Sequence, residues 1–110
     1  MAEESGGDLS KSEKWRKLVE KNPDNELARY SLGSALFEAG QFADAEPHFA
    51  RALELKPDWV MAYILRARCL IRLGRVDEAR PLLAQGRTHS IQQHHDAPVE
   101  EIDAILAELP

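Results

Sequence analysis

The feature that most constrains this chain is an internal repeat, because the sequence from Pro23 matches itself when it is shifted by 34 residues to Pro57. Some residues 34 positions apart are identical, and others, such as Phe49 and Leu83, keep only the residue type. A fixed period of this length predicts stacked supersecondary units, each of which buries its apolar face only against its neighbours. The pairs that are identical in the overlay are Pro23/Pro57, Asp24/Asp58, Ala28/Ala62, Leu36/Leu70, Gly40/Gly74, Ala45/Ala79, Pro47/Pro81 and Ala50/Ala84.

Each copy of the repeat carries the signals of a helical hairpin. Asp24 and Asp58 are predicted N-caps, since a carboxylate can accept hydrogen bonds from the free amides of a first helical turn. Gly40 and Gly74 are predicted to end the first helices, because glycine best tolerates the left-handed conformation found there. A second helix should follow in each copy, from Phe42 to about Leu55 in the first one.

The segments on either side of the two copies extend the pattern. A helix at the leading end is predicted to be the second half of a repeat, because Trp15 stands one period before Phe49. At the other end, Asp96 is a predicted cap for a helix whose apolar stripe would close the edge of the stack. The predicted units are a disordered acidic tail at 1–8, a leading half-repeat at 9–22, repeats at 23–56 and 57–92, and a linker with a capping helix at 93–110.

Composition excludes several classes of protein. The 110 residues suffice for one small domain, and a net charge of −5 argues against a nucleic-acid surface, which needs a basic face. No apolar run approaches the roughly 18 residues of a membrane span, so no membrane partner is expected. The N-terminus lacks the apolar core of a signal peptide, and the single cysteine, Cys69, cannot form an internal disulfide. A cytoplasmic location is therefore expected.

The repeat resembles the tetratricopeptide repeat family, whose pattern is W-x2-L-G-x2-Y, then A-x3-F, then P. The resemblance implies an all-α fold, a right-handed solenoid of antiparallel helix hairpins with about six helices here. One departure is Arg66, which replaces the leucine of the first copy, so that it must pack differently or extend its head to water. The first copy matches with Arg29-x2-Leu32-Gly33-x2-Leu36, Ala45-x3-Phe49 and Pro57, and the second with Tyr63-x2-Arg66-Ala67-x2-Leu70 and Ala79-x3-Leu83.

In this family the first helices of the hairpins line a concave groove that receives a peptide or helix of another protein. The resemblance therefore implies a non-enzymatic adaptor, without cofactor or metal, whose anchors would be Tyr30, Phe37 and Ile64. The alternative is a structural homodimer, in which the groove, or the N-terminal end with Trp15, is occupied by a second copy. The capping helix could also cover part of the groove. The residues predicted to face the groove are Leu27, Tyr30, Ser34, Phe37, Met61, Ile64, Arg68, Ile71 and Arg72.

Three other features have a functional and a structural interpretation. Six arginines between Ile64 and Arg87 could bind an acidic partner segment, but internal pairing with Glu100, Glu101 or Asp103, or plain solvation, is favoured. The histidines His89, His94 and His95 lack the one-turn spacing of ligands on one helix face, so a solvated loop is favoured over a metal site. Cys69 is predicted to be a small buried filler rather than a nucleophile.

Overall fold

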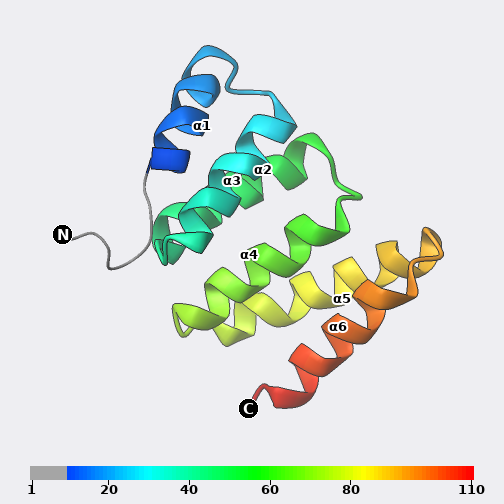
Figure 1. The fold of residues 1–110 in the computed structure, drawn as a ribbon. Coiled ribbons are helices and arrows are strands. Elements are labelled where there is room, and N and C mark those ends of the chain that lie inside the picture. The colour runs from blue at the N-terminus through cyan, green and yellow to red at the C-terminus, as the bar shows by residue number, and fades with distance from the viewer. Residues whose placement is uncertain (1–9) are drawn as a thin grey trace.

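The computed structural model describes residues 10–110, which form six α-helices and no strand (Figure 1). The predicted all-α fold is therefore confirmed, whereas the predicted tail at 1–8 lies outside the described residues. The fifth helix ends at Gln92 and the sixth begins at Asp96, so the gap between them lies where the linker was predicted to start. The helices are α1 (Ser10–Lys21), α2 (Glu26–Glu38), α3 (Phe42–Leu55), α4 (Val60–Arg72), α5 (Val76–Gln92) and α6 (Asp96–Glu108).

The first helix of each hairpin ends at a left-handed glycine. Gly40 and Gly74 both have φ of 78°, a conformation that a side chain on Cα disfavours. Each glycine follows the C-cap residue of its helix, Ala39 in α2 and Leu73 in α4. This confirms the predicted stop signals and explains why the same residue recurs at this point of both copies.

The start of α2 differs from the prediction by one residue. Asn25, rather than Asp24, occupies the N-cap, and its side-chain oxygen accepts from the Ala28 amide at 3.0 Å. Asp24 lies one position too early to reach the first turn and instead forms a salt bridge with Arg51 of α3. The predicted role of Asp24 was therefore wrong, although the signal for a helix start was correct.

The predicted N-cap residues of α4 and α6 were also wrong. Trp59 stands at the N-cap of α4 without a side-chain cap bond, while Asp58 lies 3.5 Å from the Lys56 ammonium. At α6 the N-cap is His95, again without a side-chain bond, and Asp96 is the first helical residue. A carboxylate in the first turn still interacts favourably with the positive end of the helix dipole, so Asp96 supports the helix start without capping it.

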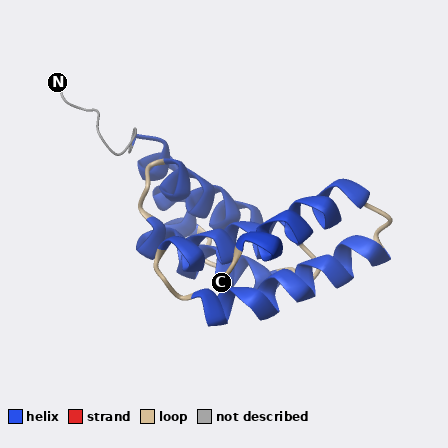
Figure 2. Ribbon diagram, turned by 90° about the horizontal axis from the view of Figure 1, so that it is seen from below, coloured by secondary structure: helices blue, strands red, loops and turns tan. Residues whose placement is uncertain are grey.

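The six helices form two layers. Each helix packs on the next one along the chain, and α4 also contacts both α2 and α6, whereas α1, α3 and α5 have no such mutual contact among the described residues. The loops that join the helices are short, as Figure 2 shows. Because helices of the same layer, within residues 10–110, contact each other only through the α2–α4 and α4–α6 pairs, the stack curves with α2, α4 and α6 on its concave side.

The tightest crossing in the stack lies between α2 and α3. Phe49 is fully buried, and a Cβ added to Gly33 would lie only 3.0 Å from its ring. A second close approach joins the last helices, since a Cβ on Gly86 of α5 would meet Tyr63 of α4 at 3.0 Å and Ile102 of α6 at 3.4 Å. Small residues therefore set the distance between helices at both ends of the core.

The departure at Arg66 has a local explanation. Its Nε lies 2.8 Å from Glu46 Oε2 on α3, and the two side chains are 29% and 13% exposed. In the first copy the equivalent residue, Leu32 of α2, is buried in an apolar cluster instead. Arg66 therefore packs differently from its counterpart, paired with a carboxylate rather than extended into water.

We expect Gly33→Ala to lower the free energy of unfolding by about 1–3 kcal/mol, because the added methyl group would overlap the Phe49 ring. The same substitution should cost less in a Phe49→Leu background, where the ring is absent. Urea denaturation of the four proteins of this double-mutant cycle measures the difference. Equal costs in both backgrounds would show that the ring does not set the crossing.

We expect Glu46→Ala to cost about 1–3 kcal/mol, since it leaves the Arg66 guanidinium half-buried without its partner. Glu46→Ala/Arg66→Leu, which restores the residue type of the first copy, should recover most of that loss. The matched control is Glu54→Ala, which removes an exposed carboxylate from the same helix and should change stability by less than about 0.5 kcal/mol. A double variant no more stable than Glu46→Ala would contradict this account.

Candidate partner-binding groove

Most of the residues predicted to face the groove lie at or near the surface of the concave layer. Leu27 is 58% exposed, and Met61 is also exposed. The residues with partial exposure are Tyr30, Ser34, Phe37, Arg68 and Ile71, and Arg72 is exposed. The structure therefore leaves eight of the nine predicted residues accessible to some degree.

Ile64 is the exception, because it is fully buried. It belongs to a core cluster that also contains Leu83 of α5 and Ile102 of α6. The predicted role of Ile64 as an anchor for a partner was therefore wrong. The reason is α6, which packs against α4 and α5 and covers the middle of the concave side of the last repeat.

The helix α6 also forms one wall of a hollow in the groove. A cavity of about 240 Å³ lies where the C-terminal ends of α2, α4 and α6 meet, and four apolar side chains from the three helices line it. Its charged lining residues are Arg68 and Arg72 on α4 and Glu108 on α6. The apolar lining residues are Phe37, Ile71, Ile105 and Leu109.

Four of the residues predicted to face the groove, Phe37, Arg68, Ile71 and Arg72, line this hollow, but the sequence did not predict the wall that α6 contributes. The apolar stripe of α6 was visible, and it predicted a helix packed on the stack. Which residues of α6 would face α2 and α4 could not be predicted, because α6 lies outside the two matching copies of the repeat. Ile105 and Leu109 pack against the core on one side and also line the cavity.

An aromatic and cationic stack borders this hollow through Phe37 and Arg72. The rings of Phe37 and Phe42 meet edge to face, with centroids 5.3 Å apart. The Arg72 guanidinium lies 4.6 Å from the centroid of Phe42, in the geometry of a cation–π contact. Arg72 forms no salt bridge within residues 10–110, so its N–H donors can bind an added carboxylate.

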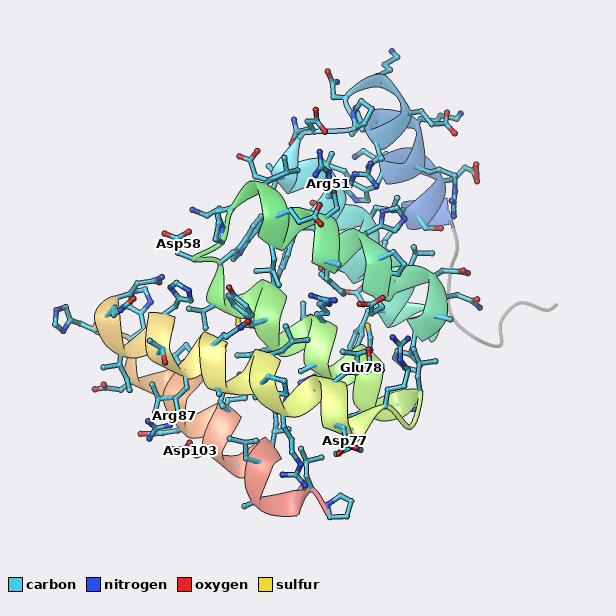
Figure 3. The ribbon with its side chains drawn as sticks, turned by 180° about the vertical axis from the view of Figure 1, so that it is seen from behind. Arg51, Asp58, Asp77, Glu78, Arg87 and Asp103 are labelled. Atoms are coloured by element: carbon cyan, nitrogen blue, oxygen red, sulfur yellow. The ribbon has the colours of Figure 1, made fainter. Side chains whose placement is uncertain are left out.

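The other arginines of the block are paired internally, as favoured by the sequence. Arg68 binds Glu101 at 2.8 Å, and Arg87 binds both carboxylate oxygens of Asp103 at 2.8 and 3.2 Å (Figure 3). The second pair lowers the pKa of the Asp103 carboxyl below its ordinary value, through hydrogen bonding and charge. Because both pairs join α6 to the preceding repeat, they help to hold the wall of the hollow in place.

The N-terminal half of the groove is organised by stacked rings. Tyr30 stacks on Trp59 with centroids 4.3 Å apart, and its edge meets Phe49 at 5.7 Å. Burial raises the pKa of the Tyr30 hydroxyl, and a hydrogen bond with Ser34 partly opposes that rise. Tyr30 thus supports the loop before α4, which leaves Leu27 and Met61 as the exposed apolar side chains of this half.

The histidines and the cysteine have structural positions. The ring of His89 stacks on Tyr63 at 5.6 Å, and His94 has φ of 60° in the turn after α5. Across residues 10–110 no three His, Cys, Asp or Glu side chains are grouped so that they could hold a metal ion. Cys69 is fully buried, and this burial raises the pKa of its thiol to about 12, which confirms its predicted role as a filler.

Comparison with known families gives the same assignment as the geometry. Two models described as tetratricopeptide repeat match residues 12–58 and 36–89, which together cover α1 to most of α5. The chain belongs to the tetratricopeptide repeat family. Neither matched model is that of a catalytic family, and repeats of this kind form protein–protein interaction modules.

Individual relatives match only part of their own length. The chain is 33% identical over 61 residues to "Protein STIP1 homolog" of Dictyostelium discoideum and to "DnaJ homolog subfamily C member 3" of Bos taurus, each covering 56% of this chain. It is 35% identical over 79 residues to "Vi polysaccharide export protein VexE" of Salmonella typhi, which covers 68% of this chain. The chain spans only 11–12% of the length of these relatives.

None of the helices in residues 10–110 has the length and apolar character needed to cross a membrane.

We expect Cys69 to resist alkylation by iodoacetamide at pH 8, because the thiolate is the nucleophile and a pKa of about 12 keeps the thiol neutral there. Addition of guanidinium chloride should expose the thiol and make labelling fast. Mass spectrometry of the time course measures both rates. Complete labelling of the native protein within minutes would contradict the buried position.

Proposed function

We propose that this chain binds an apolar and acidic segment of a partner protein in the hollow at the C-terminal ends of α2, α4 and α6. The observation that carries the proposal is the combination of apolar walls with Arg72, which lies over the Phe42 ring and forms no salt bridge with a described residue. The family makes a protein ligand the natural occupant.

The size of the hollow favours a side chain of a polypeptide over a small molecule. Its volume of about 240 Å³ is below the about 300–1,000 Å³ typical of small-molecule sites. Ile105 of α6 and Leu109 just after it line the hollow together with Phe37 and Ile71, so a single large apolar side chain would have apolar contacts from three helices and the chain end. Such an anchor in a preformed pocket is the usual centre of a peptide-binding site.

The charges on the rim would orient the bound segment. Arg72 on the α4 side can donate to a carboxylate, whereas Glu108 on the α6 side would repel one. Arg68 contributes less, because Glu101 already neutralises it. We therefore expect the acidic residue of the ligand to lie next to the anchor, on the side of α4.

The test is selection of binders from a random peptide display library, followed by calorimetry with the selected peptides. We expect sequences with a large apolar residue beside Asp or Glu. Arg72→Glu should weaken their binding at least about tenfold, which corresponds to about 1.4 kcal/mol. Ile71→Asp should have a similar effect, because it places a charge in the apolar wall.

The matched control is Arg16→Glu, which makes the same change of charge on α1, remote from the hollow. Circular dichroism and thermal melting should first show that all variants are folded. Peptides that bind wild type and Arg72→Glu equally, or that are lost with Arg16→Glu, would place the binding surface elsewhere.

A further inference from the structure

One side of α1 is uncovered where the corresponding side of the next repeat is buried. Ala45, Phe49 and Ala52 of α3 are each 0% exposed, because α2 packs over them. Their counterparts one period earlier are Lys11, Trp15 and Leu18, of which Leu18 is 37% exposed and Trp15 half-buried. No helix among the described residues lies on this side of α1, which therefore has the surface of a second helix without its first.

Two hollows mark the place where such a helix would lie. A trough of about 380 Å³ runs between α1 and α2 and is lined by Lys11, Lys14 and Trp15 on the α1 side. A second hollow of about 90 Å³ lies at the other end of the same side, between Leu18 and the exposed Leu27. Both would be covered by one helix that packed along α1.

The uncovered side of α1 is basic. With about 100° of turn per residue, Lys14 and Lys21 lie on the same side as Leu18, whereas Glu13 and Glu20 lie on the opposite flank. Lys14 also lies over the Trp15 ring, at 5.5 Å from its centroid. Lys11 has only a long contact of 3.5 Å with Glu38, between two exposed side chains. A helix that binds here should therefore be acidic.

The helix α6 has the complementary properties, at the opposite end of the molecule (Figure 1). It contains five carboxylates and no lysine or arginine. Glu101 and Asp103 are bound to arginines of the same molecule, whereas Asp96, Glu100 and Glu108 form no salt bridge with a described residue. Its core side is taken up by Ile102, and its outer side carries the small exposed residues Ala104 and Ala107 beside Glu100.

We propose that two copies of this chain associate head to tail, with the outer side of α6 from one copy packed on the uncovered side of α1 from the next. The contact would form an intermolecular hairpin of the type that α2 and α3 form within the chain. Trp15 would lie against the small residues of α6, much as Phe49 lies against Gly33. The lysines of α1 would face Asp96 and Glu100.

Charge also argues against a symmetric dimer through either end. Two α1 helices would bring lysines against lysines, and two α6 helices would bring carboxylates against carboxylates. The contact is therefore heterologous, so that each copy keeps one free end and longer assemblies can grow. It lies apart from Ile71 and Arg72, so its failure would leave the proposed peptide site intact.

The test uses variants that block one end each, studied by sedimentation velocity at low salt. Lys14→Glu/Lys21→Glu blocks the basic side of α1, and Asp96→Lys/Glu100→Lys blocks the acidic side of α6. We expect wild type to exceed the monomer mass of 12.4 kDa increasingly with concentration. Each blocked variant should associate at least about tenfold more weakly with itself. Controls with the same charge changes elsewhere are Lys56→Glu on the loop after α3 and Glu20→Lys on the far flank of α1.

Mixing separates this arrangement from any other. In the mixture the unmodified α1 of one variant meets the unmodified α6 of the other, and the two reversed surfaces are again opposite in charge, so that both contacts between different variants are complementary. We expect the mixture to associate far more strongly than either variant alone, and this association to be lost in about 1 M salt, where the screening length is about 3 Å. A monomeric wild type at millimolar concentration, a mixture that associates no better than the separate variants, or blocked variants that self-associate like wild type would each overturn the proposal.

Discussion

The close crossing of α2 and α3 is the constraint on which the rest of the structure depends. Phe49 can be fully buried only because Gly33 has no side chain, and this places the two helices of the hairpin at a fixed distance. In the next repeat the corresponding residues, Ala67 and Leu83, are both fully buried. Once the hairpins have this shape, their first helices meet and their second helices separate, which produces the concave surface.

The helix α6 determines which part of that surface remains available. It buries Ile64, closes the middle of the last repeat, and supplies one wall of the hollow beside Arg72. Two arginine–carboxylate pairs, Arg68–Glu101 and Arg87–Asp103, fix its position by directed bonds in addition to apolar packing. A helix that closes the stack thus also shapes the concave surface.

The repeat period allowed the fold and most helix ends to be predicted, because every copy places the same signals at the same positions. The cap residues were misassigned by one position, since Asp24 and Asp58 stand close enough to a helix start to be chosen by type alone. Ile64 was misplaced for a different reason. Its burial depends on α6, whose register no second copy in the sequence could reveal.

The pattern of contacts has a consequence for how the chain folds. Every helix touches only its nearest neighbours or the helix after next, so no contact requires the two ends of the chain to meet. Closing such short loops costs little conformational entropy, and proteins dominated by local contacts fold quickly. Folding can therefore begin in either hairpin and spread outward, and the two terminal helices, each with one neighbour along the chain, are the segments that open most easily.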